Sequence, residues 1–189
     1  MTQNIIQRLA KSNYSSPQLF FGYIFWIGLI PPVSAFFGTY LYGWPLGVVE
    51  PVRLSLAQAA AVSIFYELAL MAGFISTAIV IKWMASVYAP KATLKDAFMV
   101  IAVAGTPIMI GGVAHIYPSI LFHVLALSPI FAWSGYLFFI SIPIFLKTNQ
   151  DRGIFMGCAV LGYLVTAFLS LLGLSAIAWV NGIGPNLGV

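Results

Sequence analysis

The stretch AVSIFYELALMAG, residues 61–73, is apolar except for one charged side chain, Glu67. No second charged residue occurs between Ala57 and Ile81. A helix needs about 20 apolar residues to cross about 30 Å of hydrocarbon, so residues 57–81 predict a membrane-spanning helix. A carboxylate at that depth costs about 3 kcal/mol or more. Glu67 is therefore expected to be neutral, or to have a partner on another helix or in a ligand.

The whole chain resembles this stretch in composition. Of its 189 residues, 61% are hydrophobic and 6% are charged, and the mean hydropathy is +1.01. Soluble domains carry about 25% charged residues, so a soluble fold is excluded. We predict an all-α polytopic membrane protein with an N-terminal segment (1–18), a domain of five transmembrane helices (19–180) and a tail (181–189). The expected spans are 19–42, 57–81, 97–116, 119–142 and 153–180.

The charged loops predict the orientation of the chain. Of the 8 Lys and Arg residues, all but Arg53 fall in alternate segments on one side of the membrane, namely Arg8, Lys11, Lys82, Lys91, Lys95, Lys147 and Arg152. Basic loops remain cytoplasmic in bacterial inner membranes. This predicts an inner-membrane protein with its N-terminus in the cytoplasm and its C-terminus outside. Because the basic residues are scattered over loops, the net charge of +4 does not indicate nucleic-acid binding.

The N-terminal segment contains an amphipathic pattern. Residues 2–11, TQNIIQRLAK, place Ile5, Ile6 and Leu9 on one helical face, with polar residues on the other. A short helix at the membrane surface is one interpretation. A frayed terminus is the alternative.

No motif for catalysis, cofactors or metal is visible. The stretch GTPIMIGG, residues 105–112, lacks the Gly-Lys-Ser/Thr of a P-loop, and the chain has no GxSxG, HExxH or paired carboxylates. His115 and His123 flank an expected turn at 117–118, with no Cys, Asp or Glu nearby. This pattern favours anchoring at the membrane interface over a metal site. We expect no catalytic residue, no metal and no cofactor.

Small residues recur at a spacing that allows helices to pack closely. Ala69, Gly73 and Thr77 are four apart in the second span, and Gly153 and Gly157 repeat the spacing in the fifth. Such ridges support either contacts within the bundle or contacts between chains.

Two longer stretches resemble a known family. VAGTPIMIGGVAHIYP, residues 103–118, places Thr106-Pro107 in a span that ends at a proline turn. SGYLFFISIPIFLKTNQDRG, residues 134–153, follows with Tyr136, Pro143 and Lys147 and then an Asp-Arg pair. In this order the stretches resemble the bacterial branch of the YIP (Ypt-interacting protein) membrane family, and IPPVSAFFGTYLYGW, residues 30–44, is similar to the first span of its inner-membrane members. The chain departs from the family pattern at Phe139, where a Tyr is typical, and at Ser141, where a Gly is typical.

The resemblance implies five transmembrane helices, a cytoplasmic N-terminus and a non-enzymatic role. The eukaryotic relatives bind small GTPases and act in vesicle trafficking and membrane shaping. Their long acidic N-terminal region has no counterpart here, because only about 18 residues precede the first span. This departure places small-GTPase binding in doubt.

We therefore expect a scaffold or accessory subunit that contacts membrane lipids, a second copy of itself or another membrane protein. The residues expected to form an intramembrane polar or partner contact are Glu67, Thr106, Pro107, Tyr136, Pro143 and Lys147. We hypothesise that the third or fourth span holds Glu67, through backbone freed at Pro107 or Pro143. The alternative function is a small transporter or channel in which Glu67 meets a water-accessible path.

Overall fold

The computed structural model describes residues 2–43, 51 and 53–181, and these are helical with short connections and no strand. Five helical stretches are long and apolar enough to cross a membrane: Ser16–Tyr42, Leu56–Tyr88, Leu94–Ile116, Ile120–Leu146 and Gln150–Ile177. The predicted all-α class with five spans is confirmed. The tail at 182–189 and most of the loop at 43–56, including Glu50, lie outside the described residues.

The first span is built from several short helices. It comprises α2 (Ser16–Leu19), a π-helical turn η1 (Phe20–Ile24), α3 (Phe25–Gly28), α4 (Ile30–Phe37) and a second π-helical turn η2 (Gly38–Tyr42). The break between α3 and α4 comes directly before Pro31 and Pro32, neither of which has an N–H. The carbonyl of Gly28 consequently has no donor three or four residues ahead of it.

The other spans are longer helices that begin at side-chain caps. They are α5 (Leu56–Tyr88), α6 (Leu94–Gly111) with a terminal 3₁₀ turn η3 (Gly112–Ile116), α7 (Ile120–Leu146) and α8 (Gln150–Val180). Ser55 and Gln58 form a capping box at α5, and Thr93 and Asp96 form one at α6. These caps lie in polar sequence, so the helices start outside the apolar stretches from which the spans were predicted. At the other end, α5 continues past residue 81 to Tyr88, as expected from the lack of a helix breaker before Ala89-Pro90, and α7 continues past residue 142 to Leu146.

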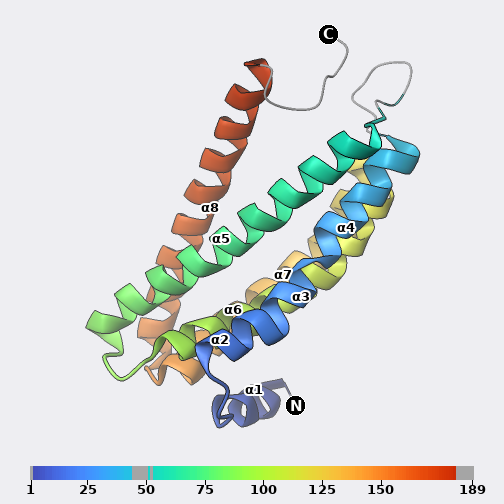
Figure 1. The fold of residues 1–189 in the computed structure, drawn as a ribbon. Coiled ribbons are helices and arrows are strands. Elements are labelled where there is room, and N and C mark those ends of the chain that lie inside the picture. Colours follow the sequence, from blue (N-terminus) through green and yellow to red (C-terminus); the bar gives the residue numbers. More distant parts are fainter. Residues whose placement is uncertain (1, 44–50, 52, 182–189) are drawn as a thin grey trace.

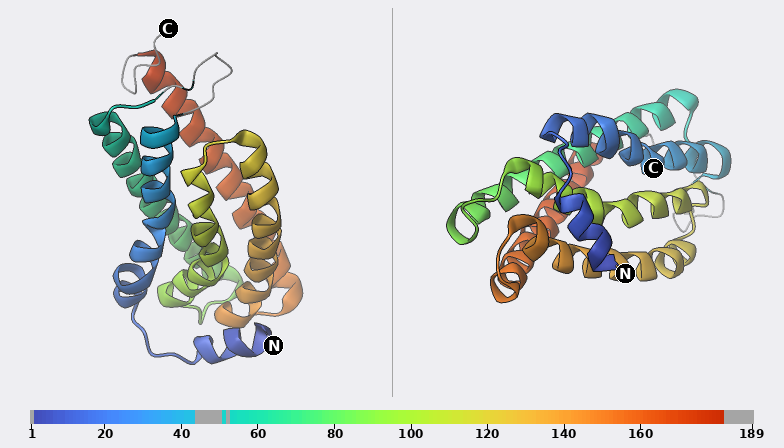
Figure 2. Two further views of the ribbon diagram at one scale, coloured as in Figure 1. Left: turned by 90° about the vertical axis from the view of Figure 1, so that its right-hand side faces the viewer. Right: turned by 90° about the horizontal axis from the view of Figure 1, so that it is seen from below.

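The core of the protein lies between α6 and α7, which are side by side in Figure 1 and Figure 2. Of the most apolar stretch of Leu94–Ile116, 56% is buried inside the protein, against 17% for Gln150–Ile177. α6 is therefore central, and α8 is peripheral. Ser134 of α7 adds a polar tie to this core by donating its hydroxyl hydrogen to the carbonyl of Ala104.

The N-terminal helix α1 (Thr2–Ala10) lies across one end of the bundle (Figure 1). Ile6 is 2% exposed in the core, and Leu9 packs against that core, whereas Ile5 is 55% exposed. The Lys95 ammonium donates to the carbonyl of Ser12 and ties the α1–α2 connection to α6. The terminus is thus a docked helix rather than a frayed segment.

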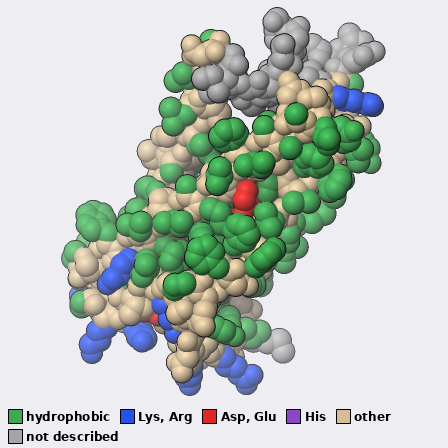
Figure 3. Space-filling model, in the orientation of Figure 1, with side chains coloured by type: hydrophobic (Ala, Val, Ile, Leu, Met, Phe, Trp, Pro, Cys, Tyr) green, Lys and Arg blue, Asp and Glu red, His purple; other side chains and the backbone are tan. Residues whose placement is uncertain are grey.

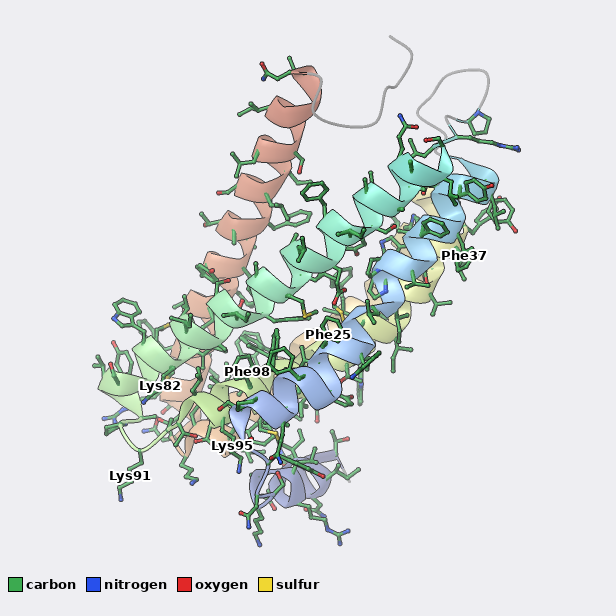
Figure 4. All side chains as sticks on the ribbon, in the orientation of Figure 1. Phe25, Phe37, Lys82, Lys91, Lys95 and Phe98 are labelled. Atoms are coloured by element: carbon green, nitrogen blue, oxygen red, sulfur yellow. The ribbon has the colours of Figure 1, made fainter. Side chains whose placement is uncertain are left out.

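Lys82, Lys91 and Lys95 lie at the same end of the bundle as α1 (Figure 4), and most Lys and Arg side chains gather there (Figure 3). We call this the basic end. It is formed by α1, the α5–α6 connection and the α7–α8 connection. Asp96 does not pair with Lys95 there, because its carboxylate accepts hydrogen bonds from the N–H and hydroxyl of Thr93 at 2.7 and 2.8 Å.

Candidate functional site

Glu67 lies on α5 and faces the first span. Its side chain is 9% exposed, and both carboxylate oxygens are buried with no hydrogen-bond partner among the described residues. A Cβ placed on Gly28 would lie 3.6 Å from Oε1 and 3.8 Å from Oε2. The same Cβ would lie 2.5 Å from Cε of Met71, one turn further along α5. The carboxyl group therefore packs against the end of α3.

The hypothesis that the third or fourth span holds Glu67 stays a prediction. Among the described residues, its carboxyl makes no hydrogen bond to the backbone near Pro107 or Pro143. Pro143 instead packs against α8, because a Cβ on Gly153 would lie 3.1 Å from its Cδ. The residue beside the carboxyl is Gly28, whose own carbonyl lacks a helical donor. The unpartnered carboxyl of Glu67 thus lies beside a residue whose carbonyl has no helical donor.

A second feature is a groove of about 1020 Å³ between the first span and α6. Its wall on α6 is formed by Met99, Ala102, Val103 and Thr106, and its other lining residues come from α1, α2, η1 and the α1–α2 connection: Leu9, Tyr14, Pro17, Gln18, Leu19, Phe21, Gly22 and Tyr23. The volume is close to the upper limit for small-molecule pockets, which is about 1,000 Å³.

Thr106 lies at the edge of this groove and pairs with Tyr23. The two hydroxyl oxygens are 2.8 Å apart, and Thr106 also donates to the carbonyl of Ala102 at 2.5 Å. Because a threonine hydroxyl has one hydrogen, Tyr23 is the donor and Thr106 the acceptor. The bond ties the π-helical turn of the first span to α6 just before Pro107.

The residues Tyr136, Pro143 and Lys147 do not converge on either feature. Lys147 ends α7 in the left-handed region, at φ 54° and ψ 44°. The N–H groups of Lys147 and Thr148 both donate to the carbonyl of Pro143. Tyr136 is 47% exposed and lies beside Trp133. This set builds the turn into α8 and an exposed aromatic surface.

Residues 3–180 match the model described as the Yip1 domain. The chain belongs to the Yip1 family. This confirms the resemblance inferred from its proline-centred stretches.

Members of the Yip1 family with similar sequences include two proteins named "Inner membrane protein YohC", from Escherichia coli strain K12 and from Escherichia coli O6:H1 strain CFT073. Each is 26% identical to this chain over 177 residues, which cover 94% of this chain and 91% of the relative. No solved structure matches the chain.

The two small-residue ridges of this Yip1-family chain have different surroundings. Gly157 packs against α7, since a Cβ there would lie 2.7 Å from Cε1 of Phe139. Gly73 has nothing within 4 Å of its Cβ position, and its carbonyl accepts the hydroxyl of Thr77 at 2.6 Å. Gly153 and Gly157 thus form a contact between helices, whereas Gly73, one turn beyond Ala69, faces open space.

The two histidines lie together at the end opposite α1. Their ring centroids are 5.0 Å apart, and His115 Nδ1 donates to the carbonyl of Gly112 at 2.8 Å. Tyr66 also lies near His115, at a distance of 6.0 Å between the ring centroids. Within the described ranges, no three His, Cys, Asp or Glu side chains lie close enough together to hold a metal ion.

Sequence reasoning missed Gly28 and Tyr23. The signal for Gly28 was present, because two prolines at 31 and 32 remove both helical donors for its carbonyl. Tyr23 gave a weaker signal, as a hydroxyl in the middle of an apolar span. Its pairing with a residue 83 positions away is visible only in the fold.

Proposed function

We propose that this Yip1-family protein is a non-enzymatic scaffold or accessory subunit of a bacterial inner membrane, and that α8 binds a transmembrane helix of its partner. The inner-membrane location agrees with the name of the YohC relatives. The N-terminus is assigned to the cytoplasm, because the basic end contains the N-terminal helix.

The observation that carries this proposal is the packing of α8. Its buried residues are Gly153, Met156, Gly157 and Val160, all near its start, and none of residues 161–177 is buried. That stretch corresponds to about 25 Å of helix at about 1.5 Å per residue. Figure 1 shows α8 diverging from the bundle along it. A large part of this helix is therefore free to contact another chain.

The exposed part of α8 has the composition of a helix–helix contact. Gly162, Thr166 and Ser170 are four apart, and each hydroxyl donates to the backbone of its own helix, at 2.9 and 2.8 Å. Small residues with internally satisfied hydroxyls let two helices approach closely in lipid. A second copy of this chain and a different membrane protein both fit this surface.

The test compares Gly162→Leu with Gly135→Leu, because neither Cβ position has a neighbour within 4 Å. Native mass spectrometry of the full chain in mild detergent should show a stoichiometric complex for the wild type and for Gly135→Leu. Gly162→Leu should weaken the complex about tenfold, which corresponds to about 1.4 kcal/mol of contact energy. A monomeric wild type without any stoichiometric partner, or equal losses in the two variants, would contradict the proposal.

The second candidate function is a small transporter or channel, and the unpartnered carboxyl of Glu67 favours it. Transporters place coupling ions at breaks in their helices, where carbonyls lack helical donors. Glu67 packs against such a break at Gly28. In proteoliposomes, this function predicts a pH-dependent ion flux that Glu67→Gln abolishes while the protein remains folded. A flux equal to that of empty liposomes, or unchanged by the substitution, would exclude it.

A further inference from the structure

We propose that the groove between the first span and α6 binds one anionic phospholipid of the leaflet at the basic end. An acyl chain would lie along α6, and the phosphate would lie near Arg8, Lys11 and Lys95. This site is separate from α8 and from Glu67, so it stands or falls independently of both proposed functions.

The wall on α6 has the shape and depth that an acyl chain requires. The lining residues Ala102, Val103 and Thr106 follow Met99 by three, four and seven positions. This spacing places all four on one continuous face of the helix. Eleven residues separate Lys95 from Thr106, which is about 16 Å along a helix. That distance is about half of a hydrocarbon core of about 30 Å. The groove therefore extends from one interface to the middle of the membrane, which is the depth of one leaflet.

The opposite wall is formed in part by the π-helical turn η1. Gly22 lies in this turn and lines the groove, and a Cβ added to it would meet nothing within 4 Å. π-helical turns within α-helices are frequent at functional sites. The hydrogen bond between Tyr23 and Thr106 satisfies both hydroxyls at the deep end. The surface left for a ligand is thus mainly apolar.

Basic residues flank the shallow end of the groove. Leu9 and Tyr14 line it there, Arg8 directly precedes Leu9, and Lys11 follows Leu9 by two residues. Lys95 donates to the carbonyl of Ser12, between those two lining residues. Asp96, the nearest acidic residue in the sequence, is occupied by the cap of α6. Charge complementarity therefore selects an anionic over a zwitterionic headgroup.

The first test fills the groove. The full-length protein is purified in mild detergent and mixed with equal amounts of phosphatidylglycerol and phosphatidylcholine, and bound lipid is measured by native mass spectrometry. The wild type and Gly135→Leu should retain about tenfold more phosphatidylglycerol than phosphatidylcholine, or a larger excess. Gly22→Leu should lose about tenfold of this retention, because its side chain occupies the space of the acyl chain.

The second test changes only charge, and it also serves if Gly22→Leu fails to fold. The double variant Arg8→Gln, Lys11→Gln removes two exposed positive charges beside the groove. Lys91→Gln with Arg152→Gln removes two exposed charges elsewhere at the basic end. The first pair should reduce the preference for phosphatidylglycerol about tenfold, and the second should leave most of it. Equal retention of both lipids by the wild type, or the same result for the two pairs, would overturn the proposal.

Discussion

Replacing Glu67 by lysine is expected to prevent stable accumulation of the protein, whereas replacing it by leucine should leave stability nearly unchanged. The lysine ammonium would have to lie against Gly28 and Met71, in the middle of an apolar helix bundle. No acidic side chain lies near it within the described part of the chain, since Asp96 and Asp151 are at the basic end. A charge buried in this way costs about 3 kcal/mol or more.

The leucine variant behaves differently because the carboxyl of Glu67 makes no hydrogen bond to lose. Removing an unpartnered polar group and replacing it by an apolar one of similar size is nearly neutral or stabilising. We expect the free energy of unfolding of Glu67→Leu to be within about 1 kcal/mol of the wild-type value. Glu67→Gln, which keeps the shape of the side chain, is the matched control.

Thermal unfolding in detergent and the yield of membrane-inserted protein measure these differences. Equal yield and stability of the lysine variant would show that the carboxyl is not buried as described. A leucine variant destabilised by more than about 2 kcal/mol would show that the carboxyl makes a structural bond.

The number of spans could be predicted from sequence because length and apolar composition determine it directly. The neighbours of Glu67 could not. α5 is apolar around its whole circumference, so the sequence does not show which face points inward. The rotation of the helix is set by its contacts with α3, α4, α6 and α8, which no local pattern reveals. That Gly28 of the first span lies beside the carboxyl of Glu67 is therefore visible only in the fold.

Motif spacing singled out residues but could not give their structural surroundings. Thr106 has a partner, Tyr23, that no local pattern identifies. Pro143 and Lys147 form a turn, because the left-handed conformation of Lys147 brings two N–H groups to one carbonyl. Gly73 and Gly157 share the same spacing pattern, yet only Gly157 contacts another helix. Whether a small residue packs depends on the crossing of two helices, which is a property of the whole fold.

Substituting alanine at Gly38 or Gly112 should destabilise the protein by about 2–3 kcal/mol each, because both lie where the first span meets η3 without room for a side chain. A Cβ on Gly38 would overlap the carbonyl oxygen of His115 and lie 3.1 Å from that of Ile116. A Cβ on Gly112 would lie 2.7 Å from Cβ and 2.9 Å from Cα of Pro31. Backbone atoms and a proline ring cannot rotate away, so α4 would have to move relative to η3.

The matched controls are Gly73→Ala and Gly135→Ala, which are helical and have nothing within 4 Å of the added carbon. Alanine is favoured over glycine in a helix by about 0.5–1 kcal/mol, so the controls should equal or exceed the wild type in stability. Equilibrium unfolding in mixed detergent micelles compares all four variants. If Gly38→Ala and Gly112→Ala were as stable as the controls, the close approach of the first span to η3 would be wrong. The position of Pro31, and with it the break against which Glu67 packs, would then have to be assigned differently.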